Sequence, residues 1–294
     1  MQFKNYTLAP CLLIVIIGLS IFFNVFYHPQ GGSIDNALIG LVIYLLPAVF
    51  YLVIKGRSYI PSLRLRVPKP LGVGLTISGA VLLIAGYLLI KTLKFRMTGS
   101  IYIAGYDPEE VNLAGGSLYI LIAYILIPAF CEEFVFRGII LTEYDVCGPF
   151  ISCIVSSFLF AIVHIKAESF ALYFYLGMIL AIMTYVSGSV FPAIAAHALN
   201  NLFAIYGNAF LGKVLGQPQN MIISTFVLVV IFLLMLIAML YSIENIYIRR
   251  GNENTPSPVI GYEDSFLTRL FQAVLAPTFL ICTAIIVALN MLNF

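Results

Sequence analysis

Residues 221–242 are MIISTFVLVVIFLLMLIAMLYS and contain no charged side chain. A transmembrane helix requires about 20 consecutive, mostly apolar residues, because the hydrocarbon core of a bilayer is about 30 Å thick. Inside that core the backbone polar groups must bond to one another, and a helix achieves this within a single segment. This stretch therefore predicts a membrane-spanning helix.

Eight further apolar runs of similar character lie on either side of it. They fall near 8–27, 37–54, 71–92, 117–131, 149–165, 169–186, 190–211 and 267–291. The run that begins at residue 117 is expected to continue as a helix past its charges, as far as the turn before Gly148 and Pro149. The sequence therefore predicts an all-α protein, a polytopic transmembrane helical bundle with about eight or nine spans.

Composition supports a membrane protein and excludes other classes. Hydrophobic residues make up 62% of the chain and charged residues 10%, whereas soluble domains carry about 25% charged residues. The net charge of +2 comes without a basic tract, so we expect no nucleic-acid partner. The five cysteines are odd in number and lack a CxxC spacing, which predicts neither a disulfide framework nor a cysteine metal site.

Basic residues in short loops predict the orientation of the spans. One basic loop, from Lys55 to Lys69, follows the second run, and Arg249 and Arg250 follow the eighth. Nine spans put both loops on one side of the membrane, which we expect to be cytoplasmic. A basic group at 91–96 conflicts with this orientation. The first run is expected to be an uncleaved span, because it is too long for a signal peptide and no cleavage site follows it.

Three regions of the chain follow from these runs. Residues 1–116 are expected to be N-terminal transmembrane helices, residues 117–212 a central region of further helices, and residues 213–294 C-terminal transmembrane helices. Within the last region, residues near 243–266 are the most polar stretch of the chain and are expected to form a solvated loop. Pro256 and Pro258 would stop a helix there.

Ionisable residues inside membrane spans are costly and are functional candidates by default. In this chain they concentrate in three apolar runs, at Glu132, Glu133 and Arg137, at His164, and at His197 followed by Asn201. Glu133 and Arg137 are four residues apart and can pair on one helix face. Glu132 points about 100° away from that face. His197 and Asn201 are also four residues apart, so both can face one cavity.

Counting along the helices predicts whether these residues meet. Glu132 and His164 are each 16 residues from Gly148, so both lie roughly 24 Å from that turn at a rise of 1.5 Å per residue. His197 follows Gly188 closely and lies about 10 Å shallower by the same count. A tilted or short seventh helix set deep in the bundle would close this difference.

Other interpretations of the same residues remain open. Glu133 and Arg137 can be a helix-stabilising pair, a membrane histidine can serve packing, and Asn201 can hold helices together. A transporter or channel could use Glu132, Glu133 and the two histidines to relay protons or bind a cation, although transporters often repeat such groups in both halves. A non-catalytic scaffold or immunity protein is a third possibility.

The three motifs together are similar to those of a known family. EExxxR at Glu132–Arg137, FxxxH at Phe160–His164 and HxxxN at His197–Asn201 occur in that order, each on its own apolar run. In this the chain resembles the CAAX-protease and bacteriocin-processing family, which includes the type II CAAX prenyl endopeptidases. The resemblance covers roughly residues 117–212 and implies that this region is the catalytic core of an intramembrane protease.

This resemblance implies a multi-pass intramembrane endopeptidase, in a bacterial cell membrane, that acts on a peptide or lipidated protein substrate such as a prenylated CAAX protein or a bacteriocin precursor. It implies that Glu132 and His164 activate water, and that His197 and Asn201 hold the oxyanion. The catalytic candidates are Glu132, Glu133, Arg137, His164, His197 and Asn201. Glu132, His164 and His197 also form an acceptable ligand set for zinc or another divalent metal. The chain has no HExxH motif, so the residues require no cofactor, and a metal-free mechanism is favoured.

Overall fold

The computed structural model describes residues 8–26, 34–70, 72–98, 116–165, 167–207, 221–252 and 264–292. These residues form helices joined by short connections, and no strand occurs among them. The predicted all-α class is confirmed.

The helical elements follow one another along the chain with few interruptions. They are α1 (Ala9–Phe26), α2 (Ile34–Lys55), η2 (Arg57–Leu63), α3 (Gly72–Thr98), α5 (Ser117–Ile120), η3 (Leu121–Leu126), α6 (Ile127–Glu133), η4 (Phe134–Ile140), α7 (Leu141–Glu143), η5 (Tyr144–Cys147), α8 (Pro149–Val163), η6 (Ala167–Ser169), α9 (Phe170–Ser187), α10 (Phe191–Leu202), η7 (Phe203–Gly207), α12 (Met221–Asn252), α13 (Phe266–Val274) and α14 (Pro277–Met291). Elements η3, η4 and η7 are π-helical, and η2, η5 and η6 are 3₁₀ helices.

The described residues of each of the nine predicted runs are mainly helical, but not all of these helices are long enough to cross a bilayer. Among the described residues, six helical stretches have the length and apolar character of a span. The pair α13 and α14, bent by 58° at Pro277, gives a seventh if it counts as one span. Helix α8 has 15 residues, and α10 has 12 followed by five in η7. Both are shorter than the about 20 residues that a crossing requires, so the structure supports six or seven spans where eight or nine were expected.

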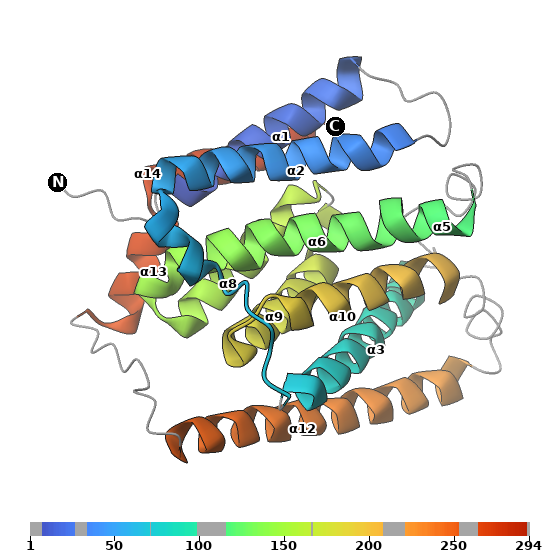
Figure 1. Ribbon diagram of the computed structural model, residues 1–294. Coiled ribbons are helices and arrows are strands. Elements are labelled where there is room, and N and C mark those ends of the chain that lie inside the picture. Colours follow the sequence, from blue (N-terminus) through green and yellow to red (C-terminus); the bar gives the residue numbers. More distant parts are fainter. Residues whose placement is uncertain are drawn as a thin grey trace.

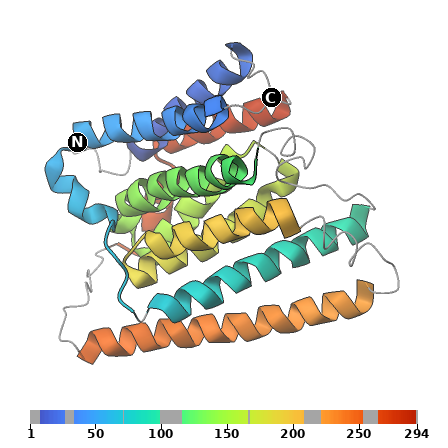
Figure 2. The same ribbon diagram turned by 45° about the vertical axis from the view of Figure 1, so that its right-hand side comes forward.

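The bundle is layered, with the short helices in its interior. Helices α1, α2 and α14 form one edge, and α12 lies along α3 at the opposite edge (Figures 1 and 2). Helices α6, α8, α9 and α10 lie between these edges. Large apolar side chains are exposed over the outer helices, among them Phe226 and Ile237 on α12. Soluble monomers rarely expose so continuous an apolar surface, and the chain is an integral multi-pass membrane protein.

The expected polar loop near 243–266 is wrong over its first ten residues, because α12 continues to Asn252. Ile246 is 5% exposed and packs into the core, which gives this part of the helix a buried face. Arg249 and Arg250 lie in the last turn, where cations interact favourably with the helix dipole. Pro256 and Pro258 lie outside the described residues.

The two basic loops lie at the same end of the bundle, as the sequence predicted. Arg66 Nε donates to the carbonyl of Gly188 at 2.7 Å, and Arg250 Nη2 donates to the carbonyl of Val186 at 2.7 Å. Both acceptors belong to the C-terminal end of α9. Lys94 instead pairs with Glu168 just before the start of α9, at the opposite end.

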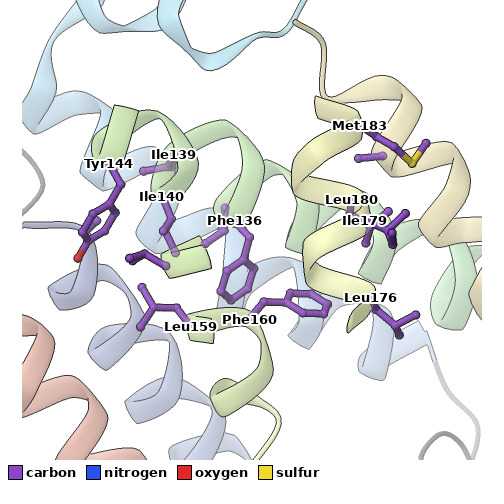
Figure 3. Close-up of a cluster of buried hydrophobic side chains, with 14 of the residues drawn as sticks. Phe136, Ile139, Ile140, Tyr144, Leu159, Phe160, Leu176, Ile179, Leu180 and Met183 are labelled. Carbon is purple, nitrogen blue, oxygen red and sulfur yellow. The ribbon is translucent and has the colours of Figure 1, made fainter. Parts of the chain in front are cut away.

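The core around the interior helices depends on close backbone approach. The rings of Phe136 and Phe160 meet edge to face with centroids 5.1 Å apart, within the buried cluster shown in Figure 3. Ser156 Oγ donates to the carbonyl of Phe136 at 2.9 Å, which satisfies a backbone group of the π-helix η4. A Cβ added to Gly177 on α9 would lie 3.0 Å from Ser157 Cα on α8. These two helices therefore touch through their backbones, and glycine is what permits the contact.

We expect Gly177→Ala to lower the thermal stability of the detergent-purified protein, by about 1–3 kcal/mol of unfolding free energy, because α8 and α9 must separate to accept the methyl group. Gly18→Ala is the matched control, since a Cβ there meets nothing within 4 Å. Thermal melts of the two variants would contradict the interpretation if they shifted equally.

Candidate active site

Glu133 and Arg137 form an ion pair that is completely enclosed. Arg137 Nη1 donates to Glu133 Oε1 at 2.9 Å, and neither side chain is exposed. Arg137 Nη2 donates to the carbonyl of Gly177 at 3.1 Å, and the guanidinium lies 4.4 Å from the centroid of the Phe160 ring. The pairing that the sequence predicted within one helix is confirmed, and it also reaches α9.

His197 joins this pair from α10. Its Nδ1 lies 2.8 Å from Glu133 Oε1, the same oxygen that accepts from Arg137. A carboxylate can only accept here, so the imidazole donates its Nδ1–H. This contact fixes the ring and leaves Nε2 as the atom that faces the rest of the site. Such a carboxylate–imidazole contact orients histidines in many catalytic and metal sites.

Glu132 faces both histidines from the next position along the helix. Its Oε2 atom is 3.9 Å from His164 Nε2 and 4.0 Å from His197 Nε2. This oxygen is buried and has no hydrogen-bond partner among the described residues. The prediction that Glu132, His164 and His197 lie close together is confirmed. His197 reaches the depth of Glu132 because α10 is a short helix in the interior of the bundle.

His164 is held on two sides at the C-terminal end of α8. Its Nδ1 lies 2.7 Å from the carbonyl of Phe160, so the ring donates Nδ1–H to that carbonyl and presents Nε2 to Glu132. The ring of Tyr173 stacks on the imidazole, with centroids 3.7 Å apart and planes 19° apart. The sequence did not predict a role for Tyr173. This residue is nine positions after His164 but belongs to α9, and no sequence pattern indicates that its ring stacks on the imidazole.

Phe160 lies at the centre of these groups. Its ring contacts the rings of His164, Tyr173 and His197 at centroid distances of 4.8, 6.4 and 6.0 Å. It also receives the Arg137 guanidinium on its face. The aromatic residue of the FxxxH motif therefore forms the apolar wall against which both imidazoles rest.

The two asparagines at the end of α10 differ in exposure. Asn201, the predicted oxyanion donor, lies one turn beyond His197 and is half-buried. Its predicted role stays a prediction. Asn200 is only 4% exposed, and its Oδ1 atom is enclosed without a hydrogen-bond partner among the described residues. The sequence analysis gave Asn200 no role.

The spacing around Glu132 Oε2 suits a small bridging molecule. Distances of 3.9 and 4.0 Å exceed a direct hydrogen bond, and polar groups separated in this way are commonly linked by water. Glu132, His164 and His197 retain exposed side-chain fractions of 14%, 21% and 9%, so protein atoms do not close the cluster completely. The arrangement can therefore hold a water molecule against a carboxylate and two imidazoles.

The same three residues do not form a metal site in this geometry. Tetrahedral zinc with bonds of about 2.0–2.1 Å to nitrogen and oxygen would bring ligand atoms to within about 3.4 Å of one another. The observed spacings are wider, and no group of three His, Cys, Asp or Glu side chains among the described residues is arranged to hold a metal ion. A metalloprotease assignment gains no support from these side chains.

The helix that carries both glutamates departs from regular α-helical geometry on either side of them. The π-helix η3 precedes α6, and the π-helix η4 begins directly after Glu133. Such π-helical turns inside α-helices occur frequently at functional sites. Here the wider turn contains Arg137, the residue that carries the ion pair to α9.

Comparison with known proteins agrees with the motifs. Residues 114–203 match the family model described as Type II CAAX prenyl endopeptidase Rce1-like. This range contains Glu132, Glu133, Arg137, His164, His197 and Asn201, and the resemblance inferred from the sequence is confirmed. No curated protein and no solved structure matches the chain.

The two adjacent glutamates should differ in their effect on stability. Glu133→Ala leaves Arg137 charged and buried with its ion-pair partner removed, a change that costs about 3–5 kcal/mol in soluble proteins. Glu132→Gln preserves size and removes a charge that has no ion-pair contact closer than 3.9 Å. In detergent thermal melts, Glu133→Ala should lower the melting temperature clearly and Glu132→Gln should leave it nearly unchanged. The reverse order would mean that the two residues are assigned the wrong way round.

Proposed function

We propose that this protein is an intramembrane endopeptidase in which Glu132 activates water for attack on a peptide bond. One observation carries the proposal: Glu132 Oε2 faces the Nε2 atoms of two imidazoles, and both rings are fixed through Nδ1 by a separate acceptor. The family match over residues 114–203 supports peptidase chemistry at this cluster.

The first step uses Glu132 and His164. A water held between Glu132 Oε2 and His164 Nε2 gives its proton to the carboxylate while its oxygen attacks the scissile carbonyl carbon. The carbonyl π electrons move to oxygen and form the tetrahedral oxyanion. His164 orients the attacking water through the Nε2 lone pair of its neutral form. The Tyr173 stack and the Phe160 carbonyl keep that lone pair pointed at Glu132.

His197 and Asn201 stabilise the oxyanion. Glu132, Glu133 and Arg137 together carry one net negative charge, and protonation of His197 brings the cluster to neutrality, which a low-dielectric interior favours. The imidazolium then presents Nε2–H toward the site while Nδ1–H remains on Glu133. Asn201, one turn further along α10, supplies the amide as a second donor.

The second step breaks the peptide bond. The tetrahedral intermediate collapses, the C–N bond breaks, and Glu132 returns its proton to the amine that leaves. The products are a carboxylic acid and an amine, which become a carboxylate and an ammonium group in water, and Glu132 is again ionised for the next cycle. Glu133 and Arg137 contact no reacting atom and act as positioning residues for His197.

The substrate class follows from the location of the site and from the family description. The catalytic side chains lie inside a membrane bundle, so the substrate is a peptide or lipidated protein that enters from the bilayer. Prenylated CAAX-type proteins fit the description of the matched family, and bacteriocin-type precursors fit the resemblance seen in the motifs. We place the protein in a bacterial cell membrane on the same resemblance.

The proposal is tested with purified protein in detergent on peptides that end in a farnesylated CAAX sequence and on matched peptides without the prenyl group. Glu132→Gln should lower turnover by roughly 10²–10⁴-fold, the usual contribution of a general base. Glu168→Gln is the control, because Glu168 is an exposed carboxylate paired with Lys94 outside the cluster. Substantial activity in Glu132→Gln would exclude this residue as the base, and no cleavage by wild-type protein of any peptide would contradict the proposal.

A second experiment tests the metal-free form of the mechanism. Because the ligand atoms of Glu132, His164 and His197 stand too far apart for zinc, turnover should persist after incubation with strong chelators. Loss of activity on chelation, followed by recovery on addition of zinc, would instead make the two histidines metal ligands.

A further inference from the structure

A cavity of about 270 Å³ lies at the basic end of the bundle, apart from the catalytic cluster. It is enclosed by the start of α3, the end of α9 and the last turns of α12. Its lining residues include Lys69, Gly72, Ser187, Ile246, Arg249 and Arg250. Three of the described residues that line it are cationic and none is acidic, so the cavity concentrates positive charge.

Arg66 lies close to Arg250, beside the end of α9. At Gly188, whose φ is +67°, an added Cβ would lie 2.7 Å from Arg66 Nη2 and 3.6 Å from Arg250 Nη2. Two guanidinium groups therefore meet at one glycine. Like charges held this close repel one another, and an anion between or beside them would relieve that repulsion.

Capping of the C-terminal end of α9 involves only two of the four basic side chains near this cavity. Arg66 donates to the Gly188 carbonyl and Arg250 to the Val186 carbonyl, so these two side chains neutralise the C-terminal end of α9. Arg249 and Lys69 are exposed side chains on the wall of the same cavity. They add two positive charges to an end of α9 that two arginines already cap.

The cavity also lies where a lipid headgroup would be. The apolar spans of α3 and α9 end at this cavity, at Gly72 and Ser187, so the basic side chains stand near the boundary between the lipid-facing surface and water. Basic pockets between helices on the cytoplasmic side are a recurrent form of anionic headgroup recognition. Ser187 and the catalytic-core residue Gly177 are ten positions apart on α9, which separates the cavity from the Arg137 contact by about 15 Å.

We propose that this cavity binds a phosphate group, with the phosphodiester of an anionic glycerophospholipid as its occupant. Arg249 and Lys69 contribute the contacts to the phosphate oxygens, because arginine and lysine both bind phosphate through charge-assisted hydrogen bonds. Ile246 lines the apolar side, next to the exposed apolar surface of α12 where acyl chains would lie. The inference stands independently of the proteolytic function, since it concerns binding at a different place.

The test measures lipid binding by the full-length protein in detergent micelles doped with phosphatidylglycerol or with phosphatidylcholine of the same acyl chains. Bound lipids are counted by native mass spectrometry, and inorganic phosphate is added alone in a further arm. The variant is Lys69→Gln with Arg249→Gln, which spares the two capping arginines. The control is Lys94→Gln with Arg96→Gln, which removes two positive charges from the opposite end of α3.

Wild-type protein should retain phosphatidylglycerol in preference to phosphatidylcholine. The Lys69 and Arg249 variant should lose roughly 30-fold in affinity, and the control variant should bind as wild type does. Unchanged affinity in the Lys69 and Arg249 variant would overturn the proposal, and so would equal retention of the two lipids when inorganic phosphate does not bind either. If inorganic phosphate alone binds wild type and not that variant while neither lipid is preferred, the phosphate site stands and the lipid is excluded as its occupant. Lipid-free melting temperatures equal to wild type show that the variants are folded.

Discussion

The enclosed ion pair between Arg137 and Glu133 is the constraint on which the interior of this bundle depends. A buried charge is costly unless it is paired and hydrogen-bonded. Arg137 Nε and Glu133 Oε2 remain without a hydrogen-bond partner among the described residues, so the contacts that the other atoms make are essential. Arg137 therefore needs the Gly177 carbonyl as well as Glu133, and Glu133 needs His197 as well as Arg137. These contacts tie η4, α9 and α10 together at one point. Because Gly177 has no side chain, α8 and α9 can also contact each other through their backbones at this position.

This constraint separates the roles of two adjacent carboxylates. Successive residues on a helix point about 100° apart, so a cation that binds one glutamate closely does not bind its neighbour in the same way. Glu133 Oε1 contacts both Arg137 and His197 directly, whereas Glu132 Oε2 lies about 4 Å from both imidazoles. One carboxylate is therefore occupied by close ionic contacts, and the other is the one that we propose as the base.

The helices and several contacts of the site could be predicted from the sequence, because a long apolar run in a membrane protein reliably indicates a helix. The described residues of the nine runs are mainly helical, and Glu133 pairs with Arg137 as motif spacing suggested. Glu132 lies near His164 as the count predicted, whereas His197 joins them although the count placed it about 10 Å shallower. The number of spans and the extension of α12 to Asn252 could not be predicted, because both depend on which helix faces pack against other helices. Ile246 buries one such face and carries α12 through a polar stretch. The Tyr173 stack on His164 arises from packing between α8 and α9, and no local pattern encodes it.

The connection between α2 and α3, which carries no motif, contacts the helices that hold the candidate catalytic residues. The side chain of Arg64 bonds to Thr142 and Asp145, at the end of the helical stretch that carries Glu132. Its backbone carbonyl accepts from the Val190 amide at 3.1 Å, immediately before the helix that carries His197. Ser189 donates to the Arg66 carbonyl in the same turn. His197 lies seven residues beyond Val190, about 10 Å along α10. The depth of His197 relative to Glu132 is therefore set by a short N-terminal connection that binds the ends of both helices.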